Sequence, residues 1–366
     1  MGKSLKYNLR DAIKTIILTC VLTTGCIRTQ ELYEAPVFPR SAEAEFTVLT
    51  DELMVNMAYD LWCYKDYLIV TALTGDGFLH IYDKETGDLV MDAVGRGRGP
   101  GEVLSGRDTY LDIETGIMVW NDMLQDKVLE LQIDALLANG RSAISERTLD
   151  IDRTWLTNLF LYDGGGLAIR NLGDAATDTA GVVRLQSFDP VTGEVFAQDN
   201  SFPVEDRTAR SALYMEGRYA LSPDKTRLAA GTFFGCILET CAIGKDRIRQ
   251  TATRYFIRPE FDFNSGIPLC TDKTVCGFYD LYATDDRIYA SYDGKTNPDV
   301  VRRTQLESRP VEFCNVAVFD WKGNPETIIR TDYNIERLCV DSTSGNIYAV
   351  IYDVEGHFFL GRIKIR

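Results

Sequence analysis

The sequence predicts an all-β protein, a six-bladed β-propeller of four-stranded blades whose ring is closed by an N-terminal strand. Three observations lead to this fold. A short apolar strand after a polar turn recurs six times along the chain, at intervals of about 50 to 60 residues. The segments around it have the composition of hairpins, which gives four strands per repeat. The last repeat is one strand short, so another part of the chain must complete it.

The N-terminal segment has the pattern of a bacterial export signal. Lysine and arginine residues precede an apolar run, T-I-I-L-T-C-V-L-T-T-G, that is too short to span a membrane. The segment L-T-T-G-C at 22–26 resembles the lipobox, although Thr23 stands where an aliphatic residue is usual. We therefore expect a lipoprotein signal peptide over residues 1–25, lipid attachment at Cys26 and a tether over 26–41. The alternative is an ordinary leader, in which Cys26 has no special role.

The net charge narrows the range of partners. The full chain carries −15 at neutral pH, and loss of residues 1–25 would remove four basic side chains and one acidic side chain, which leaves −18. Such a surface repels nucleic-acid phosphates and anionic lipid headgroups. We expect no nucleic-acid partner, and membrane contact through the lipid anchor only.

The six recurring strands begin with Leu or Ile and consist mostly of small or apolar residues. Most of them follow an apolar run and a turn containing Asp, Ser or Gly, and each is therefore expected to be the second strand of a hairpin. Their first apolar residues are Leu68, Ile117, Leu167, Leu228, Ile288 and Ile347.

Three repeats contain a further hairpin downstream, in which a strand ends in Asp, a glycine turn follows and a second strand returns. These hairpins lie at 79–90, 185–196 and 316–328. A four-stranded sheet of this size must stack on neighbours around a channel, because it cannot bury both faces alone. A β-solenoid is the competing repeat fold, but its units are shorter. Helical patterning is confined to Asp134–Asn139.

The C-terminal repeat supports closure of the ring. After Ile347 the chain has room for only one more full strand before Arg366. An open edge at this point would favour aggregation, and the alternating segment Glu43–Thr50 is suited to cover it. The propeller is therefore expected to span residues 42–366, with the N-terminal strand outermost in the last blade.

The stretch V-G-R-G-R-G-P-G-E-V, residues 94–103, looks like a phosphate-binding loop but has the wrong spacing for one. It lacks the lysine and hydroxyl of a P-loop, and a proline or glutamate stands where a dinucleotide loop has its third glycine. A strand pattern follows it, so no helix N-terminus would face a phosphate. We interpret the stretch as the crossing from the outer strand of blade 1 to the inner strand of blade 2.

Two interpretations of this crossing stay open. In the first, the glycines allow sharp turns, and the arginines are solvated or paired with acidic groups. In the second, the arginines form a site for an anion or carboxylate near the channel mouth. The candidate ligand-binding residues are Arg96, Arg98, Glu102 and Arg107.

Residues 95–131 resemble an NHL-type propeller repeat. They contain a glycine-rich turn, Gly-Glu before an apolar residue, an Asp-turn-Gly hairpin, a strand ending in Asn-Asp, and a basic-apolar strand. Gly106 departs from the pattern, in which proline is typical. Together with the lipobox, residues 40–366 are similar to the TolB-like six-bladed propeller lipoproteins of Bacteroidetes. The resemblance implies a lipid-anchored protein of the outer membrane, on the periplasmic side or at the cell surface, and it specifies fold better than function.

Seven cysteines remain for the propeller when the leader and the lipid site are set aside. Outside the cytoplasm, Cys236 could pair with Cys241, and Cys270 with Cys276, where the geometry allows it. A four-cysteine zinc site is the alternative, although neither spacing is C-x-x-C. Three further cysteines are expected to be buried in strands, namely Cys63, Cys314 and Cys339.

Catalytic constellations are scarce. His80 and His357 both lie in strand-like contexts, and no G-x-S-x-G elbow is present. A metal-dependent propeller hydrolase or lyase with its site in the central channel is the alternative function, and its candidate ligands are Asp108, Asn121 and Asp122. These are also ordinary turn residues, so we expect no catalytic residue, metal or cofactor. The sequence favours a binding role toward an envelope protein, a glycan or a small anionic ligand.

Overall fold

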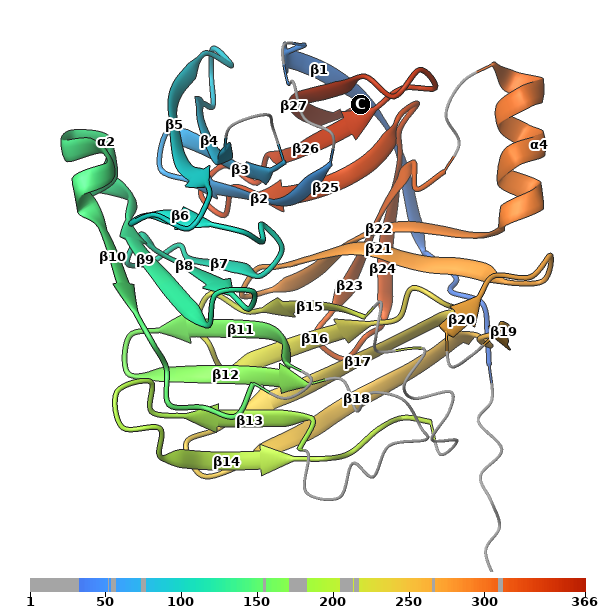
Figure 1. The fold of residues 1–366 in the computed structure, drawn as a ribbon. Coiled ribbons are helices and arrows are strands. Elements are labelled where there is room, and N and C mark those ends of the chain that lie inside the picture. The colour runs from blue at the N-terminus through green and yellow to red at the C-terminus, as the bar shows by residue number, and fades with distance from the viewer. Residues whose placement is uncertain are drawn as a thin grey trace, which may run out of the picture. The chain divides into compact units, whose positions relative to one another are not determined.

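Six blades surround a channel in the part of the chain that the computed structural model describes (Figure 1). The described residues are 33–51, 53, 57–73, 77–153, 156–170, 183–204, 213, 217–264, 267–308 and 312–366. The predicted signal peptide and Cys26 lie outside these ranges. Within them, no helix has the length and apolar character needed to cross a membrane.

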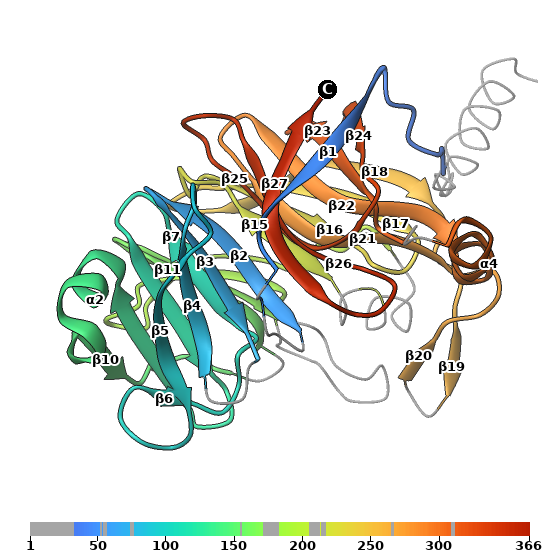
Figure 2. The ribbon, with the colours of Figure 1, turned by 90° about the horizontal axis from the view of Figure 1, so that it is seen from above.

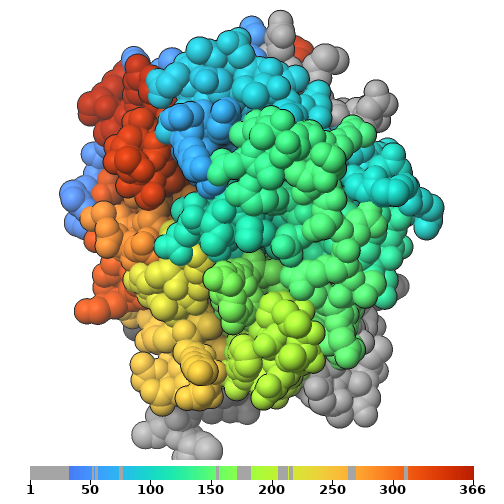
Figure 3. Space-filling view, turned by 90° about the vertical axis from the view of Figure 1, so that its left-hand side faces the viewer, coloured from blue at the N-terminus to red at the C-terminus, as the bar shows by residue number. Residues whose placement is uncertain are grey.

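The first four blades are separate antiparallel sheets. Blade 1 contains β2 (Ala58–Tyr64), β3 (Tyr67–Ala72), β4 (Gly77–Asp83) and β5 (Leu89–Arg96), with the short β6 (Glu102–Val103) parallel to β5. Blade 2 contains β7 (Thr109–Asp112), β8 (Ile117–Asp122), β9 (Lys127–Gln132) and β10 (Ile144–Arg147). Blade 3 contains β11 (Leu156–Tyr162), β12 (Gly165–Arg170), β13 (Leu185–Phe188) and β14 (Val195–Asp199). Blade 4 contains β15 (Arg218–Leu221), β16 (Arg227–Gly231), β17 (Cys236–Ile243) and β18 (Ile248–Ile257). Figure 3 shows blades 2 and 3 (green) between blade 1 (cyan) and blade 4 (yellow).

The last two blades share one eight-stranded sheet. Blade 5 contains β21 (Val275–Ala283), β22 (Arg287–Thr296), β23 (Asn315–Asp320) and β24 (Pro325–Arg330). Blade 6 contains β25 (Asn334–Val340), β26 (Ile347–Tyr352), β27 (Phe358–Ile365) and the N-terminal β1 (Arg40–Thr50). A separate hairpin of β19 (Asp262–Asn264) and β20 (Ile267–Leu269) precedes blade 5.

Strand β1 closes the ring as the sequence predicts (Figure 2). It pairs antiparallel with β27, from Ala44 opposite Ile365 to Thr50 opposite Leu360. Its first four residues also pair in parallel with β24, which joins blade 6 to blade 5 and was not expected from the sequence. The strand begins at Arg40, so the last two residues of the predicted tether already belong to the propeller.

The recurring Leu or Ile begins or lies within the second strand of each blade, which confirms the repeat. Five of the six are at most 3% exposed, while Ile117 is half-buried. Apolar residues of neighbouring blades pack together, as where Phe78 of blade 1 meets Trp120 of blade 2 with ring centroids 6.0 Å apart. The core therefore lies in the layers between blades, as expected for sheets that stack around a channel.

The predicted downstream hairpins are present, and an aspartate shapes each turn. The Asp83 side chain accepts hydrogen bonds from the backbone N–H groups of Glu85 and Thr86. The side chains of Asp189 and Asp320 each accept two backbone N–H groups of the turn that follows them. Each turn then passes through a glycine with positive φ. This is the local chemistry of an Asx turn, in which a short acidic side chain replaces a backbone acceptor.

One of the two α-helices in the described residues was expected. Helix α2 (Ile133–Asn139) matches the prediction and is followed by a short 3₁₀ turn, η1 (Gly140–Ala143). Helix α4 (Asn297–Glu307) was missed because it has no apolar stripe and buries only Val300. Its start has a local signal, since the Thr296 side chain accepts a hydrogen bond from the N–H of Asp299.

The structure corrects two further expectations. His80 lies in β4 as expected, but His357 is exposed in the turn before β27 rather than in a strand. Cys236 and Cys241 lie on one strand, about 16 Å apart at an ordinary rise per residue, and pack into different core layers. A disulfide between them is therefore excluded by geometry. All seven described cysteines are free thiols, and Cys63, Cys314 and Cys339 are buried as predicted.

Candidate ligand site at the channel mouth

The inner strands of the blades line a central cavity with two connected parts. The outer part has a volume of about 410 Å³. The inner part, deeper along the same strands, has a volume of about 110 Å³. The two parts belong to one channel because six residues line both of them, namely Asp60, Arg107, Asn158, Tyr219, Asp280 and Leu281.

Strand register places one residue from each of five blades at the same level of this cavity. In each of these blades the inner-strand residue is paired with a residue of the second strand, three positions after the recurring Leu or Ile. In blade 1, for example, Asp60 is opposite Thr71, three positions after Leu68. In blade 3 the register shifts at this level, and Thr157 and Asn158 line the outer cavity. We call the five residues the mouth ring: Asp60, Thr109, Arg218, Asp280 and Arg337.

The two arginines of the mouth ring share an aromatic neighbour. Arg218 donates a hydrogen bond from Nε to the carbonyl of Tyr279, at 2.6 Å. Arg337 donates from Nε to the carbonyl of Tyr59 and from Nη1 to the carbonyl of Glu336. The guanidinium carbons of Arg218 and Arg337 lie 5.6 and 5.3 Å from the centre of the Tyr279 ring. Such contacts with an electron-rich ring face stabilise both cations.

The two aspartates of the mouth ring are held by neighbouring blades. The Thr109 hydroxyl donates to Asp60 at 2.6 Å, and the Leu338 N–H donates to Asp280 at 2.9 Å. Burial raises the pKa of Asp60 to about 7 and raises the pKa of Asp280 despite the nearby Arg337. Removal of water from around a carboxylate disfavours its charged form. Burial therefore favours the neutral form of both carboxyl groups.

Arg107 supplies a further positive charge at the cavity. It lies two residues before the first strand of blade 2, is exposed, and lines both parts of the channel. No hydrogen bond or ion pair joins its guanidinium to another described residue. Its donors are therefore available to a ligand.

An ion-pair network lies at the opposite end of the inner strands. Lys225, in the hairpin between β15 and β16, contacts Asp112 at 2.8 Å and also Glu114, both in the first hairpin of blade 2. Blades 2 and 4 are separated by blade 3, so this contact reaches past an intervening blade. Only 14% of the lysine side chain is exposed. The network therefore braces the floor of the channel.

The glycine-rich crossing is held by a contact of its own and by side chains of blade 2. The Glu102 carboxylate accepts the N–H of Gly99 at 2.8 Å, and Gln125 donates to the carbonyl of Gly97 at 3.0 Å. A Cβ at Gly97 would lie 2.1 Å from a Glu102 oxygen, so an alanine at this position would require the Glu102 side chain to move. The crossing joins β5 to β7 as predicted, with β6 as an added short strand.

The structure brings only one of the four predicted loop residues to the cavity. Arg107 lines it, whereas Arg96 and Arg98 are exposed at the end of the outer strand β5 and in the loop that follows. Glu102 faces the loop backbone. A ligand role for Arg96, Arg98 and Glu102 stays a prediction from the sequence.

The fold and the repeat pattern match a known family. The model of the TolB-like 6-blade propeller-like family matches residues 37–343. The chain belongs to this family. No curated protein matches it at a significant level.

Two solved structures illustrate the TolB-like fold. One is a protein of Bacteroides fragilis described as exported, with a TM-score of 0.55 and 13% identity, which covers 91% of this chain and 99% of its own. The other is a DUF4221 family member from Bacteroides vulgatus, with a TM-score of 0.54 and 12% identity, which covers 89% of this chain and 99% of its own. At this identity the similarity establishes the fold of the TolB-like propeller, and its function must be argued from the site.

The metal-ligand candidates of this TolB-like propeller have structural partners. Asp108 is buried, accepts hydrogen bonds from the Asn121 side chain at 2.5 Å and the Leu159 N–H at 3.1 Å, and so ties blade 2 to blade 3. Burial raises its pKa to about 7. Asp122 accepts the N–H of Leu104 at 2.6 Å and anchors the crossing. These residues do not appear among those that line the cavity.

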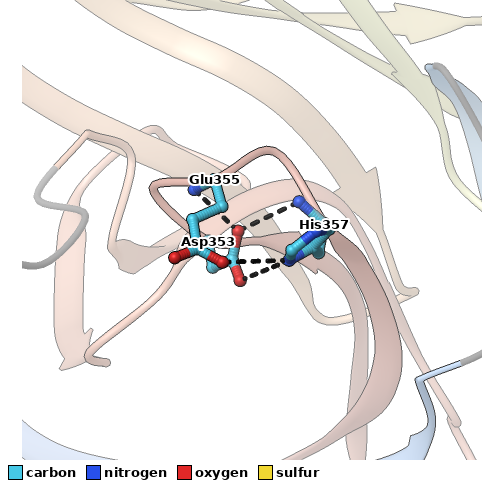
Figure 4. Close-up of side chains that lie close together, drawn as sticks. All are labelled: Asp353, Glu355 and His357. Carbon is cyan, nitrogen blue, oxygen red and sulfur yellow. Dashed lines mark hydrogen bonds and ion pairs between the residues drawn. The ribbon is translucent and has the colours of Figure 1, made fainter.

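One cluster of potential metal ligands lies on the surface of the TolB-like propeller. Asp353, Glu355 and His357 have ligand atoms within 4.8 Å of one another, in the turn between β26 and β27 (Figure 4). The Asp353 carboxylate accepts the backbone N–H groups of Glu355 and His357, at 2.9 and 3.0 Å. The cluster is thus accounted for as a hairpin turn.

None of the five mouth-ring residues was predicted from the sequence, although a signal was present. Arg107, Arg218 and Arg337 each stand ten positions before the recurring Leu or Ile of their repeat. The same Tyr-Asp pair stands at 59–60 in blade 1 and at 279–280 in blade 5. Aligning the six TolB-like repeats on their second strands would have placed these residues at one end of the channel.

Proposed function

We propose that this TolB-like propeller is an exported, lipid-anchored envelope protein that binds a small anionic ligand at the mouth of its channel. The observation that carries the proposal is Arg107, an arginine without a partner among the described residues, beside a cavity that also contains Arg218 and Arg337. Arginine presents several donors in a planar fork, which suits carboxylate and phosphate groups.

The surroundings support a small anion over a large partner. The outer cavity, of about 410 Å³, is in the range of small-molecule sites. The chain carries −15 overall, so a cluster of three arginines is a local exception to its charge. A channel lined by low-dielectric walls strengthens the attraction between these arginines and an anion.

Export and lipid attachment rest on the N-terminal sequence. The basic segment, the apolar run and the L-T-T-G-C sequence at 22–26 together support them. The structural neighbour from Bacteroides fragilis is likewise described as exported.

Calorimetric titration of the full chain in detergent tests the binding proposal. The probes are gluconate, glutarate and inorganic phosphate, with neutral glucose as a matched ligand without charge. We expect at least one anion to bind at least tenfold more tightly than glucose, and Arg107→Ala to weaken that binding at least tenfold.

Two control variants locate the site. Arg302→Ala removes an exposed arginine of α4 that does not line the cavity, and should leave binding unchanged. Arg98→Ala tests the loop interpretation. Loss of binding in Arg98→Ala with no loss in Arg107→Ala would move the site from the channel mouth to the crossing. Absence of binding by every anion would refute the proposal.

A further inference from the structure

The geometry points to a zwitterionic ligand for this channel, a free α-amino acid with an apolar side chain. This inference rests on the proposed anion site and specifies the chemical class of its ligand. It requires three features in one cavity: donors for a carboxylate, an acceptor for an ammonium group, and a small space with an apolar wall next to both.

Opposite charges alternate along four of the five mouth-ring residues. Arg218, Asp280, Arg337 and Asp60 come from blades 4, 5, 6 and 1, which follow one another around the closed ring. A ligand with a single negative charge would meet two carboxyl groups at the same level as the two arginines. A zwitterion instead presents one group to each kind of side chain, which avoids contact between like charges.

Both kinds of group have unused hydrogen-bonding capacity. Asp60 accepts the Thr109 hydroxyl with Oδ2, while Oδ1 has no partner among the described residues. Arg337 uses Nε and Nη1 for backbone carbonyls, and its Nη2 is likewise without a partner in the described chain. Arg337 is buried, with 9% exposure, and lines the outer cavity. Its guanidinium therefore contacts the channel rather than bulk water.

The state of Asp60 agrees with this assignment. Burial raises its pKa to about 7, which shows that the carboxylate has too little positive charge nearby to offset its desolvation. A ligand ammonium group at Oδ1 would supply that charge.

A smaller compartment with a mixed lining lies directly below the charged groups. The inner cavity has a volume of about 110 Å³. Trp62, Leu111, Phe160 and Leu221 form an apolar wall, while polar groups such as Asn158 line the rest, and Asp60 lies at the junction with the outer cavity. A cavity of about 150 Å³ can hold benzene, so this smaller space has room for a side chain of the size of leucine or valine, which would pack against the apolar wall. An indole group would be too large.

Three probes with one carbon skeleton separate the contributions. L-leucine carries both charges, 4-methylpentanoate lacks the ammonium group, and L-leucinamide lacks the carboxylate. We expect titration calorimetry of the full chain in detergent to show leucine binding at least tenfold more tightly than either of the other two. L-tryptophan should bind at least tenfold more weakly than leucine.

Two variants connect these preferences to residues. Asp60→Asn should weaken leucine at least tenfold without weakening 4-methylpentanoate. Arg107→Ala should weaken leucine and 4-methylpentanoate but not leucinamide. If Asp60→Asn fails to fold, as judged by thermal unfolding, the three-probe comparison on the unmodified chain decides the question by itself.

The outcomes distinguish this inference from the proposed function. If 4-methylpentanoate or gluconate binds as tightly as leucine, the zwitterion assignment is wrong and the anion site stands. The same conclusion follows if leucine does not bind while another anion does. If leucinamide alone binds, the mouth is a cation site, and both proposals are overturned.

Discussion

Removal of one partner from the buried ion pair between blades 3 and 4 should strongly destabilise the propeller. Arg184, just before β13, contacts Glu239 of β17 through two hydrogen bonds of 3.0 and 2.9 Å. Their side chains are only 2% and 1% exposed. Arg184 also donates to the Ser201 carbonyl, and Gln250 donates to Glu239. Glu239→Gln keeps the shape of the side chain but leaves the guanidinium buried without its counter-charge.

The expected loss is large because the remaining charge cannot reach water. Breaking a buried pair by removing one partner typically costs about 3–5 kcal/mol. For a propeller of about 330 residues, an unfolding entropy of about 2.1 cal/mol/K per residue converts this loss into a fall of about 4–7 °C in the thermal midpoint. Differential scanning calorimetry at pH 7 measures this shift directly.

Two comparisons make this prediction decisive. Asp299→Asn removes an exposed partner of Arg302 on α4, where side chains are 49% and 69% exposed, and should shift the midpoint by less than about 1 °C. The double variant Arg184→Met, Glu239→Leu should recover most of the loss, because no buried charge remains. A fall of less than about 1 °C in Glu239→Gln would refute the argument that this pair is desolvated and essential to the contact between blades.

Three further predictions concern the mouth and the anchor. Affinity for a monoanion such as 4-methylpentanoate should fall as pH rises through about 7, because Asp60, with its raised pKa, becomes negative there. Titration calorimetry between pH 6 and 8 measures this change. The variant Asp60→Asn should show no such dependence on pH. Gly106→Ala should lower the free energy of unfolding by about 1–3 kcal/mol, measured by chemical denaturation, because its Cβ would lie 2.5 Å from the Tyr59 ring. Gly95→Ala is the control, because its Cβ would have no contact under 3.6 Å and should be tolerated. Equal effects of the two substitutions would contradict this. Cys26→Ser should move the protein from the membrane to the soluble fraction of cells with an unchanged thermal midpoint, and a variant that stays with the membrane would contradict lipid attachment.

The sequence by itself determined the architecture of this protein. Each blade is encoded locally, by alternating strands and by aspartate turns such as those at Asp83 and Asp320, so six repeats could be counted without any long-range information. The missing strand of the last repeat even predicted closure by β1. The sequence also identified the crossing before blade 2, although it gave four candidate ligand residues where the structure brings only Arg107 to the cavity.

Only the tertiary structure decided where the charges meet. The mouth ring draws single residues from five blades, such as Arg218 and Arg337, and each looks like an ordinary strand residue in its own segment. Their proximity arises only when the closed ring sets the inner strands side by side at one register. Helix α4 was missed for a different reason, because it buries almost no apolar surface and therefore has no hydrophobic period to detect. Periodicity along the chain specifies strands and turns, whereas a site built across the ring depends on distances that only the packing of the blades fixes.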